Sequence, residues 1–129
     1  MYSINKKINE RLYFIDHQGS DVLYCDFSKS GENEMIELVE IAFEKAKKAG
    51  PSVSVLSNFR STPRSPNFVK KMREGGKWFN QNNVQVKIGV VGVDNSLTKV
   101  IMSVTMTITR VRNMKLFESE EAALNWLSS

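Results

Sequence analysis

The sequence has little cysteine and histidine, the residues that most disulfides, metal sites and nucleophilic active sites require. Its 129 residues include one cysteine, Cys25, and one histidine, His17. A lone cysteine cannot form an internal disulfide, and the two residues together leave only carboxylates as further metal ligands. A nucleophilic serine or cysteine usually needs a histidine as its base, so any such site has to use His17. We therefore predict a non-enzymatic protein with no metal and no cofactor.

The sequence also lacks long hydrophobic runs and an apolar leader. No segment approaches the roughly 20 apolar residues of a membrane span. The first seven residues, MYSINKK, do not contain the apolar core of a signal peptide. Cys25 stands in an apolar run, where a free cysteine is usually a small buried hydrophobe. These absences predict a cytoplasmic protein without membrane insertion.

A strong excess of one charge is absent as well. The net charge of +4 comes from 18 basic and 14 acidic residues, and the basic residues are scattered. The densest group contains neither interleaved aromatic residues nor a groove-binding motif, so it favours a solvated face over a nucleic-acid site. Its members are Arg60, Arg64, Lys70, Lys71, Arg73 and Lys77.

The apolar segments that are present follow one another as strand, helix and strand between residues 21 and 58. Residues 22–27 and 53–57 are short apolar runs, and residues 35–48 carry apolar side chains at the three-and-four spacing of an amphipathic helix. A connection of this length suits a right-handed crossover between parallel strands. The order predicts an α/β protein whose candidate site lies at the carboxyl end of the second strand.

The flanking segments extend this pattern at both ends. Residues 8–16 and 21–27 predict two antiparallel strands joined by the polar loop 17–20. Ser65 and Pro66 have the character of an N-cap and a first helical residue, although the adjacent Gly75 and Gly76 should weaken or kink the helix that follows. Asp26, late in its strand, is expected to cap the next loop through backbone hydrogen bonds.

The last third of the chain contains the one segment whose periodicity is ambiguous. Residues 84–93 form an apolar run typical of a central strand, and residues 114–117 predict another strand. Residues 94–112 fit a helical stripe, yet residues 104–109 alternate as a strand does. Ser119 is expected to cap a short helix that ends near Leu127.

Several phrases of the sequence resemble the SpoIIAA-like family of STAS-like domains, which are related in fold to the CRAL-TRIO lipid-binding domains. The phrases are VLYCDFS at residues 22–28, ELVE at 37–40, VVGV at 90–93 and KLFESEEAALNWL at 115–127. The resemblance implies a single domain over residues 1–129, with a mixed sheet of four to five strands, an N-terminal antiparallel hairpin and about four helices. It also implies a helix over residues 96–110. The better-known relatives are antagonists of anti-sigma factors, which bind a kinase-like partner under control of a phosphorylated serine.

The first candidate site is a polar loop that could bind an anion or be phosphorylated. It lies between a strand end and a helix start, where backbone N–H groups are free. The alternative is a loop that only caps its own helix. The sequence departs from the family here, because residues 56–60 lack the acidic residue, serine and glycine of a true antagonist. The candidate residues are Ser57, Asn58, Arg60, Ser61, Thr62 and Arg64.

The second candidate site is an apolar surface for a ligand or a partner subunit, formed by Trp78 and Phe79 with Met102 and Met106. Core packing is the alternative use of these four side chains. Three functional hypotheses follow. The leading one is protein association, either as a homodimer or with a regulatory protein partner. The others are a carrier of a lipid or other small apolar ligand, and a switch that responds to an anion or to phosphorylation.

Overall fold

The computed structural model describes residues 10–63, 65–93 and 113–129. Its centre is a five-stranded sheet in which the strands lie in chain order. The first two strands are antiparallel and every later neighbour is parallel, which confirms the mixed sheet and the N-terminal hairpin. The strands are β1 (Leu12–His17), β2 (Ser20–Asp26), β3 (Ser52–Asn58), β4 (Gln85–Val91) and β5 (Asn113–Phe117).

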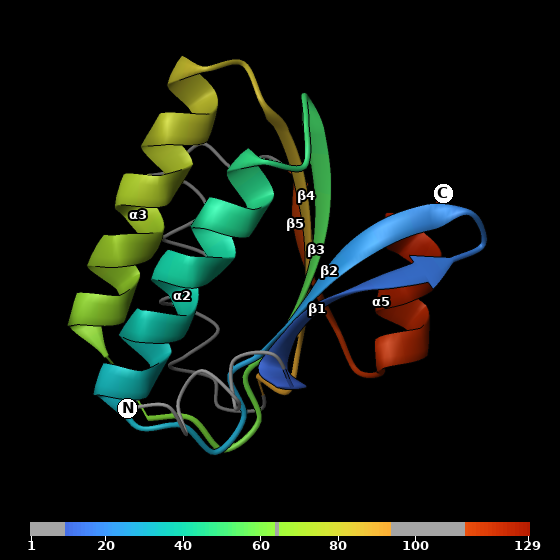
Figure 1. Cartoon of the computed structure of the whole chain (residues 1–129). Coiled ribbons are helices and arrows are strands. Elements are labelled where there is room, and N and C mark those ends of the chain that lie inside the picture. The colour runs from blue at the N-terminus through green and yellow to red at the C-terminus, as the bar shows by residue number, and fades with distance from the viewer. Residues whose placement is uncertain (1–9, 64, 94–112) are drawn as a thin grey trace.

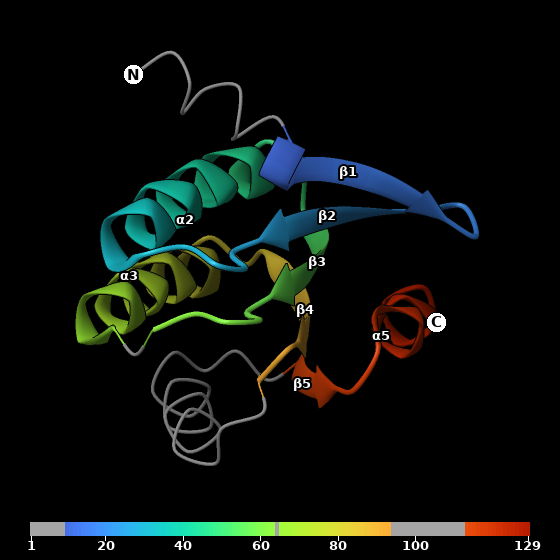
Figure 2. The ribbon, with the colours of Figure 1, turned by 90° about the horizontal axis from the view of Figure 1, so that it is seen from below.

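Helices cover both faces of the sheet. Helix α2 (Glu32–Lys47) and helix α3 (Pro66–Gln81) pack side by side on one face, and α5 (Glu120–Leu127) lies on the other (Figures 1 and 2). The helices α2 and α3 share a face because the crossovers between parallel strands have the same hand. Both helices therefore begin at the edge of the sheet where the parallel strands end.

Two details differ from the sequence prediction. Strand β1 begins at Leu12 rather than at residue 8, and Glu10 and Arg11 are helical. Helix α3 runs without a break through Gly75 and Gly76. A Cβ atom at Gly75 would lie 2.1 Å from the ring of Phe43 on α2. The glycine at position 75 therefore permits close packing of the two helices.

The two layers bury two separate cores. Leu23 and Cys25 of β2 point toward α2 and α3, whereas Val22 and Tyr24 point toward α5. This alternation is the ordinary geometry of a strand. Cys25 is fully enclosed, as its apolar setting predicted.

Some of the predicted features fall outside the described residues. They are the helix over residues 96–110 with Met102 and Met106, and Arg64 of the polar loop. Among the helices of the described ranges, none is both long enough and apolar enough to cross a membrane.

Candidate functional site

The candidate site lies at the carboxyl edge of the sheet, where β2, β3 and β4 end together. The register pairs Asp26 with Asn58 and Asn58 with Val91, so the last residues of the three strands lie side by side. The loops that follow β2 and β3 lead into the first turns of α2 and α3 (Figure 1). Helix N-termini and strand ends of this kind are common places for binding sites in α/β folds.

Hydrogen bonds fix the loop after β2 to the loop after β3. The Asp26 carboxylate accepts from the backbone N–H of Ser28 at 2.9 Å and from the Ser28 hydroxyl at 2.5 Å, which confirms the predicted cap. The backbone N–H of Lys29 donates to the carbonyl oxygen of Arg60 at 3.0 Å. The guanidinium of Arg11 donates to the carbonyl oxygens of Asp26 and Ser28. The two loops thus form one connected surface.

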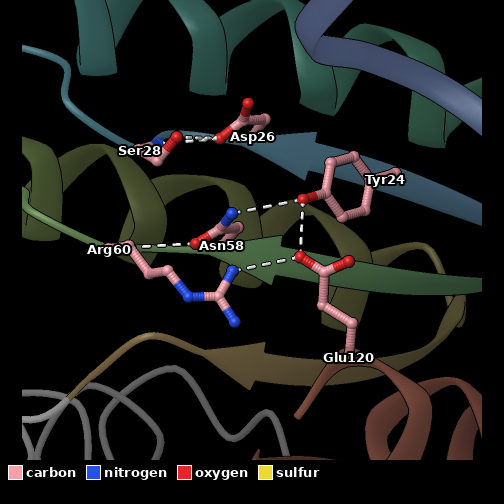
Figure 3. Close-up of polar contacts among 6 residues, drawn as sticks. All are labelled: Tyr24, Asp26, Ser28, Asn58, Arg60 and Glu120. Carbon is pink, nitrogen blue, oxygen red and sulfur yellow. Dashed lines mark hydrogen bonds and ion pairs between the residues drawn. The ribbon is translucent and has the colours of Figure 1, made fainter.

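A polar cluster connects this edge to the start of α5 (Figure 3). The Asn58 side-chain amide donates to the Tyr24 hydroxyl at 3.2 Å, and that hydroxyl donates to the Glu120 carboxylate at 2.9 Å. The same carboxylate oxygen accepts from the guanidinium of Arg60 at 3.1 Å. Because these residues come from β2, β3, the following loop and α5, the cluster ties four parts of the chain together.

Burial determines the electrostatic character of the cluster. Tyr24 is only 8% exposed, whereas the side chains of Arg60 and Glu120 are 48% and 39% exposed. Burial is the main cause that raises the pKa of Tyr24 to about 12, and the Glu120 carboxylate adds to the effect. The phenol is therefore a neutral hydrogen-bonding group at ordinary pH. The charges of the Arg60–Glu120 ion pair lie at the surface.

Residues 59–62, which we name the Arg60 segment, have a defined backbone shape. Gly92 has φ +83°, and a Cβ atom there would lie 2.6 Å from the backbone nitrogen of Arg60. The backbone N–H of Arg60 donates to the Asn58 side chain at 3.1 Å, and the Thr62 hydroxyl donates to the carbonyl oxygen of Phe59 at 2.8 Å. Ser61 is exposed and has φ +57°. The segment presents Arg60 and Ser61 to solvent on a fixed backbone.

The start of α3 adjoins the start of α2. The Ser65 hydroxyl accepts from the backbone N–H of Phe68 at 3.0 Å and donates to the carboxylate of Glu32 on α2. Pro66 occupies the first turn, so both features of the predicted helix start are confirmed. Ser65 is buried, and its hydroxyl serves the two helix starts rather than a ligand.

Ser57 lies apart from the rest of the predicted polar loop. Its side chain lines a cavity of about 50 Å³ between the sheet and the helices α2 and α3. The other lining residues are apolar, and Phe79 is one of them. Pockets that hold small-molecule ligands usually measure about 300–1,000 Å³. The cavity has room for a few water molecules only.

Trp78 and Phe79 also face different surroundings. Phe79 is buried beneath the two helices, whereas Trp78 lines an open groove between α2 and α3. The ammonium of Lys47 lies 4.8 Å from the centre of the Trp78 ring. The two rings are in contact, with 5.3 Å between their centres, but only Trp78 borders the open groove.

The single histidine and the single cysteine of the chain occupy structural positions. His17 ends β1, and its Nε2 atom lies 3.0 Å from the side-chain oxygen of Asn125 on α5. Burial raises the pKa of Cys25 to about 12, which leaves the thiol protonated and unreactive. Within residues 10–63, 65–93 and 113–129, no cluster of three or more His, Cys, Asp or Glu side chains is arranged to hold a metal ion.

Tyr24 and Glu120 are the residues of the cluster that sequence reasoning missed. Two features of the sequence indicate that these side chains need polar partners. Tyr24 places a hydroxyl in an apolar strand, and Glu120 places a carboxylate in the first turn of a helix. Neither signal identifies the partner, because the two residues are 96 positions apart.

The comparisons with known proteins identify the fold. No family model matches the chain, and no curated protein matches it. The structure is similar to that of an anti-sigma-factor antagonist (STAS) domain protein from Planctomyces limnophilus, with 13% sequence identity and a TM-score of 0.58. The similarity covers 92% of this chain and 99% of that one. The chain thus has a STAS-like α/β fold, as the resemblance implied.

Proposed function

We propose that this protein is a cytoplasmic, non-enzymatic regulatory domain that binds another protein through the carboxyl edge of its sheet. The observation that carries the proposal is the Arg60 segment, where Arg60 and Ser61 are exposed on a backbone held by Asn58 and packed against Gly92. A preordered loop loses little conformational freedom on binding, so its contacts contribute more to affinity. The similarity in fold to an anti-sigma-factor antagonist domain supports a regulatory role.

The three sequence hypotheses are not equally supported. Protein association requires an exposed, ordered surface, and the carboxyl edge provides one. A lipid carrier requires a large apolar cavity, and among the residues that the structure describes, the apolar cavity beside Ser57 has a volume of only about 50 Å³. We therefore favour protein association and do not propose that the protein carries a lipid.

Affinity capture with matched charge variants tests the proposal. The wild-type domain, Arg60→Gln and Lys48→Gln are immobilised, and the proteins that each retains are compared. Each variant removes one exposed positive charge, but Lys48 lies at the far end of α2. We expect a protein that is retained by the wild type and by Lys48→Gln and is lost from Arg60→Gln.

Circular dichroism of the three proteins checks that all are folded. Equal retention by Arg60→Gln and the wild type would show that the carboxyl edge is not the binding surface. Wild-type domain that retains no specific protein would contradict the association role itself.

The exposure of Ser61 beside Arg60 favours a second candidate, a switch by phosphorylation at Ser61. A phosphate on Ser61 would compete with Glu120 for the Arg60 guanidinium, because a phosphate carries more charge than a carboxylate. The tie between the Arg60 segment and α5 would then be broken. Aspartate and asparagine both tolerate the positive φ of this position, so they form a matched pair of variants.

We expect Ser61→Asp to weaken retention of the captured protein at least threefold and Ser61→Asn to leave it unchanged. The measurement is the binding affinity of each variant for that protein. Identical affinities for the two variants would reject the charge-dependent switch, while the association proposal would stand.

A further inference from the structure

The helices α2 and α3 lie side by side and carry opposite charges. Helix α2 contains five glutamates and two lysines, a net charge of −3, whereas α3 contains three lysines, one arginine and one glutamate, a net charge of +3. The exposed charged side chains differ in sign in the same sense, with a charge of −3 on α2 and +1 on α3. They are Glu37, Glu40 and Glu44 on α2, and Lys70, Glu74 and Lys77 on α3.

The two charged helices also run in the same direction and at matched levels. Both follow parallel strands and begin at the carboxyl edge (Figure 1). The ion pair between Lys71 and Glu40, at 3.0 Å, places these residues at one level. Nearer the C-terminal ends of the two helices, the contact of Lys47 with the Trp78 ring places these two residues at a second common level.

We infer that the α2–α3 face binds a second copy of this chain, with α2 of each copy lying against α3 of the other. A twofold axis parallel to the helices produces this arrangement, because the rotation exchanges the acidic and basic helices and leaves their levels unchanged. A twofold axis across the helices would place α2 on α2 and α3 on α3. Like charges would then oppose each other, which disfavours that alternative.

The levels allow the charges to pair between copies. Lys70 is adjacent to Lys71, so in the dimer it lies near the level of Glu40 and Glu37 of the second copy. Lys77 is adjacent to Trp78, and its level is about 3 Å from that of Glu44, two helical residues away. Both offsets are within the length of a lysine side chain.

The face is large enough for a weak dimer. A helix of 16 residues is about 24 Å long, and two adjacent helices are about 20 Å wide, so each copy contributes roughly 500 Å². The total of about 1,000 Å² is at the lower end of specific interfaces. Between the helices, a groove of about 280 Å³ exposes parts of Phe43 and Trp78, which add apolar contact at the centre. We expect a dimer that forms at high protein concentration and dissociates as salt screens the charges.

A charge-swap experiment tests the arrangement by analytical ultracentrifugation of the full chain at low salt. The first variant combines Glu37→Lys with Glu44→Lys, and the second combines Lys70→Glu with Lys77→Glu. A control that combines Lys29→Glu with Lys115→Glu makes the same change in net charge as the second variant, at positions outside α2 and α3. Circular dichroism checks the fold of each protein.

We expect the wild type and the control to dimerise, each variant alone to self-associate at least tenfold more weakly, and an equimolar mixture of the two variants to form a heterodimer. The mixture is decisive because each variant's α2 is then opposite an α3 of opposite charge. A wild type that is monomeric at several hundred micromolar in low salt, variants that dimerise as the wild type does, or a mixture that stays monomeric would each overturn the inference. The Arg60 segment is unchanged in these variants, so the result is independent of the proposed function.

Discussion

At the scale of single residues, Tyr24 is the side chain on which the candidate site depends most. Its hydroxyl accepts from Asn58 and donates to Glu120, and its ring packs 5.3 Å from that of Tyr13. Burial of the phenol disfavours its ionised form, because the phenolate would lose the solvation it has in water. Tyr24 is therefore a structural hydrogen-bonding group whose effect on stability depends on pH.

We expect the contribution of Tyr24 to stability to decline between pH 10 and pH 12. The folded pKa of about 12 exceeds the ordinary value of 10.0, so the contribution is fully present below pH 10. As the pH rises, the unfolded chain ionises first, and the free energy of unfolding falls. Urea unfolding of the wild type and of Tyr24→Phe, from pH 8 to pH 11.5, measures this change.

Comparison with Tyr24→Phe cancels the titration of the other residues. The stability advantage of the wild type over the variant should be constant below pH 10 and should shrink above it. An advantage that is unchanged at pH 11.5 would show that Tyr24 does not have a raised pKa.

Local sequence rules predicted the residues that act on their own loop or helix. Asp26 and Ser65 were expected to cap because their partners are two or three positions away, and these hydrogen bonds form. The pairing of Tyr24 with Glu120 could not be predicted, because it depends on where α5 docks on the sheet. The grouping of Ser57 with Asn58 overlooked a local rule: adjacent strand residues point to opposite faces.

At the scale of secondary-structure elements, the contact between α2 and α3 depends on a glycine in α3, because the packing leaves no room for a side chain there. Gly75 is buried, and the ring of Phe43 occupies the space that a Cβ atom would need. Replacing an exposed helical glycine by alanine usually raises the stability of the helix by up to about 1 kcal/mol. At position 75 the added methyl must displace the Phe43 ring, which also packs against Phe79.

We therefore expect Gly75→Ala to lower the free energy of unfolding by about 1–3 kcal/mol, the usual cost of overpacking a core. Chemical denaturation of the purified variant measures the change. In the background of Phe43→Leu, where the smaller side chain leaves room, the same substitution should be neutral or stabilising. Equal destabilisation in both backgrounds would show that the Phe43 ring is not the cause.

Periodicity predicted most element types because each helix and strand buries one face or one stripe. It placed α2, α3 and α5 close to their observed bounds, since each has a buried stripe and a recognisable start. The uninterrupted course of α3 was not predicted, because the effect of Gly75 depends on the neighbouring helix. Helix propensity describes an isolated segment, whereas here tertiary packing decides the outcome.

At the scale of the whole molecule, two cores share one sheet. The larger core lies between the sheet and the helices α2 and α3, and the smaller lies beneath α5. The two tryptophans of the chain lie in different helical layers: Trp78 is on α3 and Trp126 is on α5. Each is partly buried beside an aromatic neighbour, so its fluorescence should report on its own layer.

We expect both layers to unfold in one transition. The strands β2 and β3 send alternate side chains into the two cores, so loss of either layer exposes one face of the same strands to water. The Tyr24–Glu120 hydrogen bond adds a direct tie between the sheet and α5.

Urea titrations of Trp78→Phe and Trp126→Phe, each followed by the fluorescence of the remaining tryptophan and by circular dichroism, test the expectation. Within each variant the two probes should give one midpoint. A Trp126 signal that changes at lower urea than the circular dichroism would show that α5 undocks first, and the two cores would then be separate cooperative units.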